Sequence, residues 1–268
     1  MNNVTIVTAF FDIGRGDWSP DKGLPAYLQR TTQTYLERFG YMAKLENHIV
    51  VFTSKDLVEE VKHLRQNRPT TILTVDFPNS FIKLREEITK VQNDPEYQAK
   101  INPMQVRNPE YWNADYVVVN LLKSSFVNQA VGRGVVETDM VAWLDFGYCR
   151  SADKIPPSKK WGYYFNPDRI HLFNYKEFHQ NDSLYRIIAT NDVHILGAKI
   201  VGGKEVWPEF EELIKKQLFT LMQNGKIDDD QTLMLMSSLA KPELFELHRI
   251  PDHQKGLDPF VIFQDFNS

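Results

Sequence analysis

The chain has 268 residues and a formal net charge of -4, with 42% hydrophobic and 25% charged residues. This balance is ordinary for a globular protein, and the length suits one α/β domain with elaborations. The mildly acidic charge gives no reason to expect a nucleic acid as partner. The single cysteine, Cys149, excludes an intramolecular disulfide and fits a reducing compartment.

Two kinds of targeting segment are not found in the sequence. The start of the chain has no basic stretch followed by an apolar core, so it does not read as a secretory signal. No apolar run approaches the roughly 18 residues that indicate a spanning helix. We therefore expect a cytoplasmic protein with at most peripheral contact with the inner membrane.

The first part of the chain alternates strand and helix patterns. Strands are expected over 4–11, 48–53 and 70–75, and helices over 24–39, 55–66 and 81–92. A polar loop from Asp12 to Gly23 follows the first strand. Repeated β-α units of this kind predict a mostly parallel sheet flanked by helices.

The second part is more mixed. We expect a helix over 111–132, strands over 140–144, 171–173, 185–189 and 193–201, and helices over 204–224 and 228–239. A polar, proline-containing loop over 150–161 is the best candidate for an internal boundary. The sequence thus predicts a single domain over 1–268 with two halves, 1–150 and 151–268.

The buried-looking strand 140–144 stops at Asp145, and Gly147 follows two residues later. A carboxylate there would lie at the carboxyl edge of the sheet, where open α/β sheets bind ligands. It could hold a hard divalent cation, and the cation a diphosphate. The alternative is an Asp that accepts turn amides, with Gly147 supplying the tight turn.

Three adjacent acids, Asp228, Asp229 and Asp230, open the last predicted helix. The simpler interpretation is helix capping and complementation of the helix dipole. One acid is enough for capping, so another could act as a general base or bind an acceptor. Both interpretations remain open.

Other candidates are individually weaker. The loop after the first strand holds Asp12, which could bind a ribose or base edge, and Arg15, which could face a phosphate. Lys123 could balance a diphosphate near Asp145, or extend to the surface. The pair Gly202-Gly203 could let a ligand approach the backbone, or simply make a turn.

Several motifs of common enzyme classes are not present in the sequence. It contains no G-x-x-x-x-G-K-[ST], G-x-G-x-x-G, G-x-S-x-G or H-E-x-x-H pattern. This argues against P-loop enzymes, Rossmann dehydrogenases, α/β-hydrolases and zincins.

Two ordered motifs are more specific: Thr8-Ala9-Phe10-Phe11-Asp12-Ile13-Gly14-Arg15 and Trp143-Leu144-Asp145-Phe146-Gly147. Together with 27–39, 120–126, 202–203 and 229–231, they resemble the HtrL/YibB-type family of bacterial proteins, which is found with lipopolysaccharide and capsule genes. Their order also resembles that of GT-A glycosyltransferases. The resemblance covers nearly the whole chain and implies a GT-A-like fold.

The resemblance also implies site residues. The donor would contact Thr8, Ala9, Phe10, Asp12, Arg15, Lys123, Asp145, Gly147, Gly202 and Gly203, and Asp229 or Asp230 would be the catalytic carboxylate. Asp145 with His253 would hold Mn²⁺ or Mg²⁺. The chain departs from the Asp-x-Asp metal motif because Gly147 stands where the second Asp is usual.

By this resemblance the chain would move a hexose from a nucleoside-diphosphate sugar, most simply a UDP-sugar, to a saccharide or lipid-linked glycan acceptor. The half 1–150 would bind the donor and the half 151–268 the acceptor. Two other classes stay open. A sugar-phosphate nucleotidyltransferase would need a basic, glycine-rich first loop, which the sequence lacks. A non-catalytic partner in polysaccharide assembly is favoured by Gly147.

Overall fold

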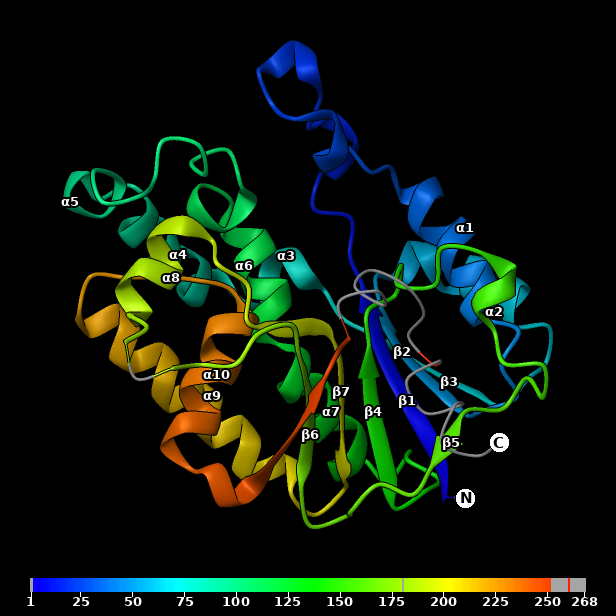
Figure 1. Cartoon of the computed structure of the whole chain (residues 1–268). Coiled ribbons are helices and arrows are strands. Elements are labelled where there is room, and N and C mark those ends of the chain that lie inside the picture. Colours follow the sequence, from blue (N-terminus) through cyan, green and yellow to red (C-terminus); the bar gives the residue numbers. More distant parts are fainter. Residues whose placement is uncertain (1, 180, 252–259, 261–268) are drawn as a thin grey trace.

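A computed structural model describes residues 2–179, 181–251 and 260 and shows a central twisted sheet with helices on both faces (Figure 1). The strand order is β3-β2-β1-β4-β7-β6-β8, and the short β5 pairs with β1. The strands are β1 Asn2–Phe10, β2 Ile49–Thr53, β3 Thr70–Thr74, β4 Met140–Leu144, β5 Gly162–Tyr163, β6 Ile170–Asn174, β7 Ile195–Gly203 and β8 Phe245–Arg249.

The sheet is mixed but mostly parallel, which confirms the predicted fold class. β1 pairs parallel with β2 and β4, β2 with β3, and β6 with β8. β7 runs antiparallel to both β4 and β6. The carboxyl ends of β1, β2, β3, β4, β6 and β8 therefore point to one edge, where β7 begins. Strands from both halves of the chain belong to this one sheet.

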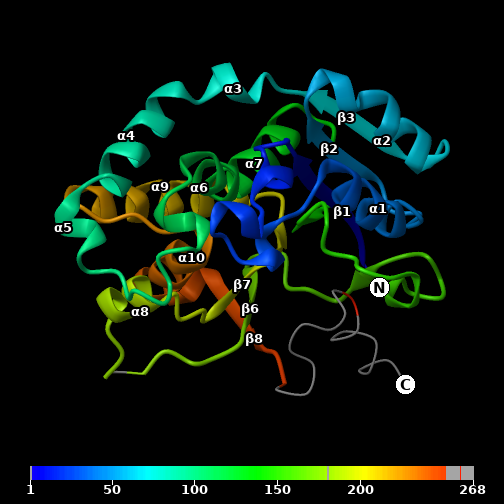
Figure 2. The same ribbon diagram turned by 90° about the horizontal axis from the view of Figure 1, so that it is seen from above.

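Helices cover both faces of the sheet, as the view from above shows (Figure 2). Each face has its own hydrophobic core. Alternate strand residues face opposite sides: Val141 and Trp143 pack with α6, α7, α9 and α10, whereas Ala142 and Leu144 face the α1 and α2 side. The helices are α1 Thr32–Met42, α2 Val58–Arg65, α3 Phe77–Ser80, α4 Ile82–Gln92, α5 Pro95–Gln98, α6 Ala114–Leu121, α7 Lys123–Gly132, α8 Leu184–Thr190, α9 Trp207–Gln223 and α10 Asp230–Ala240. No helix in the described ranges has both the length and the apolar character needed to cross a membrane.

The strand predicted over 185–189 is wrong, because this segment forms helix α8. Ser183 caps the helix by accepting a hydrogen bond from the Arg186 amide, and Asn191 ends it in the left-handed conformation. Ile187 and Ile188 are buried. A short apolar run of this kind has no periodicity that separates helix from strand, so the cap decides.

Two predicted helices have different bounds in the structure. The helix expected over 24–39 begins only at Thr32, because Thr31 is the N-cap and accepts a hydrogen bond from the Thr34 amide. The residues before it form short 3-10 turns, one of them preceded by Pro25. The helix expected over 111–132 is two helices, α6 and α7, which meet at Leu122.

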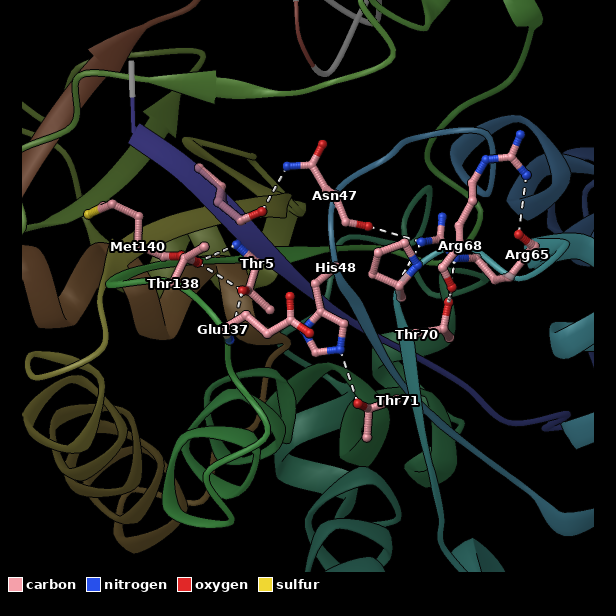
Figure 3. Close-up of polar contacts among 12 residues, drawn as sticks. Thr5, Asn47, His48, Arg65, Arg68, Thr70, Thr71, Glu137, Thr138 and Met140 are labelled. Atoms are coloured by element: carbon pink, nitrogen blue, oxygen red, sulfur yellow. Dashed lines mark hydrogen bonds and ion pairs between the residues drawn. The ribbon is translucent and has the colours of Figure 1, made fainter.

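A polar network closes the sheet edge at which β1, β2 and β3 begin (Figure 3). The Asn47 side chain donates to the Val4 and Trp161 carbonyls, at 2.8 Å each. Arg65 is 1% exposed and donates to the carbonyls of Ala43, Leu45, Asn47 and Pro69 and to the Thr70 hydroxyl. Loop carbonyls at this edge are thereby satisfied.

Candidate functional site

A cavity of about 320 Å³ lies at the opposite edge, where β1 and β4 end and β7 begins. This size is within the range of small-molecule sites. Among the predicted site residues, seven line it: Ala9, Phe10, Asp12, Arg15, Lys123, Asp145 and Gly147. The parallel pairing of β1 and β4 explains why the loops carrying Asp12 and Asp145 meet there.

Lys123 is the central polar group of this site. It is the first residue of α7, and its side chain is 5% exposed. Its ammonium lies 3.2 Å from Asp145 Oδ1 and 3.0 Å from Asp230 Oδ2, and it donates to the Gly197 carbonyl at 2.9 Å. The alternative that Lys123 extends to the surface is therefore wrong. We call Asp145, Lys123 and Asp230 the charged triad.

The triad holds Lys123 in its charged form. Burial alone lowers the pKa of Lys123, but Asp145 and Asp230 outweigh it, so the pKa lies above its ordinary value. Burial raises the pKa of Asp230 to about 6, although Lys123 opposes that rise. With both acids ionised, the triad carries a net negative charge beside the cavity.

Asp145 is the triad's exposed member. Its amide donates to the Ala198 carbonyl at 3.0 Å, which continues the β4–β7 pairing by one residue. Its Oδ1 accepts the Trp143 indole N–H at 2.8 Å and faces Lys123, which fixes the carboxylate. The side chain is 40% exposed and lines the cavity, so it can contact a ligand.

The three acids at the start of α10 do different things. Asp229 is the N-cap and accepts from the Gln231 amide, and Asp228 accepts from Thr232 Oγ1 and the Asp229 amide. Asp230 points to Lys123 and is 4% exposed. Neither Asp229 nor Asp230 lines the cavity. The capping interpretation accounts for Asp229, while Asp230 holds Lys123.

Gly197, which sequence reasoning missed, allows this close approach. A Cβ at Gly197 would lie 2.8 Å from Asp230 Oδ2. A glycine within a strand often marks such an approach, so its place in the run 193–201 was the available signal.

Gly147 is required for packing rather than for ligand contact alone. A Cβ there would lie 2.8 Å from Cδ1 of Tyr35, a cavity-lining residue that sequence reasoning also missed. The second carboxylate of an Asp-x-Asp motif would therefore clash with the Tyr35 ring as it lies in this structure. Of the other described cavity acids, Asp12 accepts from the Gly14 amide and from Thr32 Oγ1.

These residues do not fit a two-carboxylate metal site. Carboxylate oxygens are the ligands that Mn²⁺ and Mg²⁺ prefer, and Asp145 is the one described acid next to β4 that faces the cavity. The other predicted ligand, His253, lies outside the described residues.

Four arginines lie close enough to one another to interact, and we call them the arginine cluster: Arg15, Arg30, Arg38 and Arg150. Arg15, Arg30 and Arg150 line the cavity, together with Lys154. Burial lowers the pKa of Arg38, and the charges of Arg30, Arg150 and Arg15 lower it further. Like charges gathered in this way repel one another, and a bound anion would relieve the repulsion.

Arg15 is held rigidly in the cluster. Its guanidinium donates to the Tyr35 hydroxyl at 2.7 Å and to the Leu28 carbonyl at 3.1 Å, and lies 5.0 Å from the centre of the Trp18 ring. Only 9% of the residue is exposed. A fixed guanidinium suits recognition of a phosphate, because it loses little freedom on binding.

The remaining predicted residues lie elsewhere. Gly202 and Gly203 pair with Val141 and Met140 at the opposite end of β4, so the prediction that they border the donor site is wrong. A Cβ at Gly203 would lie 2.1 Å from the Pro167 carbonyl oxygen, so close chain packing explains the glycine. Thr8 is fully buried inside β1 and does not line the cavity.

Two tryptophans that could stack on a sugar ring are core residues instead. Trp161 is 3% exposed and Trp207 is fully buried, with its indole N–H donating to the Gly202 carbonyl at 3.3 Å. Cys149 is also fully buried.

Fold and site together define an α/β protein with a ligand-sized cavity at the carboxyl edge of its sheet, lined by both acidic and basic side chains. Over residues 2–265 the chain matches the family described as "Bacterial protein of unknown function (HtrL_YibB)", and it belongs to this family. It is 38% identical over 266 residues to "Protein HtrL" of Escherichia coli (strain K12), covering 98% of this chain and 93% of that protein. The predicted family is thus confirmed.

Among solved structures, the chain is similar to the crystal structure of mouse xyloside xylosyltransferase 1 in its apo form. The TM-score is 0.43 at 11% sequence identity, covering 91% of this chain and 84% of that one.

Proposed function

We propose that this protein is a glycosyltransferase that moves a hexose from a nucleoside-diphosphate sugar, most simply a UDP-hexose, to a saccharide or lipid-linked glycan acceptor. The observation that carries the proposal is that acidic and basic side chains line one cavity. Asp145 of the charged triad lines it at the end of β4, and Arg15, Arg30 and Arg150 of the arginine cluster line it as well. A nucleotide sugar offers partners for both, since its diphosphate is anionic and its sugar presents hydroxyl donors.

The arginine cluster would hold the diphosphate. Guanidinium groups donate paired hydrogen bonds to phosphate oxygens, and Arg15 is already fixed by Tyr35 and Leu28. In the reaction the acceptor hydroxyl oxygen bonds to the sugar carbon and gives up its proton to water, the bond between that carbon and the diphosphate oxygen breaks, and the diphosphate oxygen gains negative charge. Fixed positive groups beside it would stabilise the developing charge.

The charged triad would hold the sugar. Asp145 lines the cavity and is 40% exposed, so its outward oxygen can accept hydrogen bonds from sugar hydroxyls. Asp230 does not reach the cavity, and its role in this proposal is to position Lys123. The geometry thus favours Asp145 over Asp229 and Asp230 as the carboxylate that meets a ligand.

The described cavity residues offer no paired carboxylates beside β4 for a metal ion. The dependence on Mn²⁺ or Mg²⁺ implied by the family resemblance stays a prediction, and the assay includes both conditions. The donor-binding half 1–150, the acceptor-binding half 151–268 and a cytoplasmic location with peripheral contact at the inner membrane are likewise proposals. So is a role in lipopolysaccharide, O-antigen or capsule synthesis.

The test is release of the free nucleotide, UDP, GDP or CMP, by purified protein from a panel of UDP-, GDP- and CMP-activated sugars, with and without Mn²⁺. Asp145→Asn should abolish turnover while thermal unfolding stays close to wild type. The matched control is Asp56→Asn, at an exposed aspartate in the short 3-10 helix after β2. This variant should leave turnover unchanged. Full activity in Asp145→Asn would exclude this site.

Binding of the nucleotide is tested separately from turnover. Arg150→Gln should weaken UDP binding by about tenfold to a hundredfold, since a hydrogen bond to a charged group contributes about 1.5–3 kcal/mol. Arg133→Gln, at an exposed arginine after α7, is the control. Equal affinity in all three proteins would contradict a diphosphate at the arginine cluster.

A second candidate, a non-catalytic partner in polysaccharide assembly, is favoured by Gly147, where a second carboxylate would clash with the Tyr35 ring. The two functions differ in a thermal-shift scan with UDP, GDP, CMP and Mn²⁺. A nucleotide-specific rise in unfolding temperature supports the transferase, and no shift with any of these compounds supports the non-catalytic partner.

A further inference from the structure

A second group of metal-ligating side chains lies on strands β6 and β8, away from the cavity. It consists of His171, Glu246 and His248, whose potential ligand atoms all lie within 4.8 Å of one another. None of the three lines the cavity. His171 is level with Val201 on β7, whereas the cavity is lined by Leu196 and Ala198 at the other end of that strand.

Strand geometry brings these three side chains together. His171 is the register partner of Glu246 in the parallel β6–β8 pair, so both side chains point to the same face. His248 follows Glu246 by two residues and therefore shares that face. The arrangement follows from backbone register, which holds the three groups in place without a ligand.

The distances suit one small ion. His171 Nδ1 lies 2.9 Å from His248 Nε2 and 3.6 Å from Glu246 Oε2, and His248 Nε2 lies 3.8 Å from Glu246 Oε1. Ligands about 2.0–2.1 Å from a tetrahedral Zn²⁺ are separated from one another by about 3.3 Å. The two separations from His171 bracket that value, and with a single oxygen of Glu246 the three ligand atoms all lie within 4.8 Å of one another.

The His171 ring is already oriented for metal binding. Its Nε2 lies 2.8 Å from the Asn166 carbonyl oxygen, to which it can donate, and that tautomer leaves the Nδ1 lone pair directed at His248 and Glu246. A second-sphere hydrogen bond of this kind is the usual companion of a metal-binding histidine. Phe165 and Phe173 pack against the two imidazole rings, at centroid distances of 4.8 Å and 5.2 Å.

Charge and access also permit an ion. His171 is 1% exposed, but the side chains of His248 and Glu246 are 20% and 48% exposed, so the site opens to solvent on the β8 side. The Lys199 ammonium, whose charge acts on His248, would repel a cation. The Glu246 carboxylate offsets that charge, which is why a carboxylate is needed beside the two histidines.

We infer that His171, Glu246 and His248 form a Zn²⁺ site that joins β8 to β6, with the fourth position open to water or another ligand. Two imidazoles and one carboxylate form a ligand set typical of zinc. The bound ion would fix β8, the last strand in the sheet order, to β6. It would thereby also hold the start of the chain segment that follows β8. The site does not depend on the proposed transferase activity.

The experiment uses the full chain without an affinity tag, after treatment with a chelator. Zn²⁺ binding is measured by calorimetry, and Co²⁺ is substituted to read the ligand field by visible absorption. One equivalent of Zn²⁺ should bind at micromolar concentration and raise the unfolding temperature. The Co²⁺ complex should absorb in the visible as a four-coordinate nitrogen–oxygen site does.

Two variants test the ligands. Glu246→Gln and His248→Gln should each weaken Zn²⁺ binding more than tenfold. The matched controls Glu243→Gln and His63→Gln, both at exposed positions outside the site, should bind as wild type does. Glu246 is half exposed, so its variant should stay folded even where His248→Gln does not.

A third variant separates this site from the cavity. Asp145→Asn should keep the full Zn²⁺ affinity. A loss of Zn²⁺ affinity in this variant would indicate that the ion binds in the cavity and would overturn the inference. Wild-type protein that binds no Zn²⁺ at micromolar concentration would overturn it too. So would a Glu246→Gln variant with unchanged affinity.

Discussion

Replacing Lys123 with methionine is the sharpest test of the charged triad. The substitution keeps the length of the side chain but removes the ammonium that lies between Asp145 and Asp230. It also removes the donor to the Gly197 carbonyl. Asp230 would then be a carboxylate at a position 4% exposed, with its main opposite charge gone.

The expected loss of stability follows from the burial of each partner. Removing one member of a buried ion pair costs about 3–5 kcal/mol, because the remaining charge is left unpaired. The Asp145 contact adds little, since that side chain is 40% exposed and exposed pairs contribute about 0–1 kcal/mol. We therefore expect Lys123→Met to lower the free energy of unfolding by about 3–5 kcal/mol at pH 8.

A double variant separates charge from packing. Lys123→Met with Asp230→Asn leaves only the half-exposed Asp145 unpaired and no buried charge, so it should recover about 2 kcal/mol or more of that loss. The loss in Lys123→Met alone should also be smaller at pH 5. Without Lys123 the pKa of Asp230 rises further, and protonation then relieves the buried charge.

Urea denaturation followed by circular dichroism measures all three proteins at both pH values. The control is Lys100→Met, at an exposed lysine after α5, which should change the free energy of unfolding by less than about 0.5 kcal/mol. The reasoning is refuted if Lys123→Met loses less than about 1 kcal/mol at pH 8, or if adding Asp230→Asn deepens the loss.

Three further predictions concern other parts of the molecule. Gly147→Ala should weaken UDP binding, measured by calorimetry, and lower the unfolding temperature, because the added Cβ would lie 2.8 Å from the Tyr35 ring. If neither the affinity nor the unfolding temperature changes, Tyr35 moves freely. Burial raises the pKa of Glu110 to about 8, so the folded state holds a proton that the unfolded state releases near pH 4.5. The free energy of unfolding should therefore fall as the pH rises from 5 to 8, by up to about 1.4 kcal/mol per pH unit. Urea titrations should show that it changes less with pH in Glu110→Gln than in the wild type. An equal dependence on pH in both proteins would exclude Glu110 as its source. Arg65→Met should cost about 3 kcal/mol or more by urea denaturation, since it leaves the buried carbonyls of Ala43, Leu45 and Asn47 without their donor. A loss below about 1 kcal/mol would show that water replaces the guanidinium.

Local sequence signals predicted most of the fold. The strands 48–53, 70–75 and 140–144 agree with β2, β3 and β4 to within a residue. The place of Asp145 at the sheet edge also followed from the strand that it ends. Local signals failed at 185–189, where the Ser183 cap outweighs strand-forming residues.

The sequence by itself determined the alternation of strands and helices, the mostly parallel sheet and the position of Asp145 and Asp12 at its carboxyl edge. These follow from patterns within a few residues: periodicity, caps and strand ends. Only the tertiary structure decided that Lys123 joins Asp145 to Asp230, and that Gly202 and Gly203 lie at the wrong edge to meet a ligand. There is a physical reason for each. β7 runs antiparallel to β4, so the glycines at the end of β7 lie at the edge where β4 begins. Ion pairs between distant segments depend on how the helices pack on the sheet. The spacing of residues along the sequence predicts neither feature.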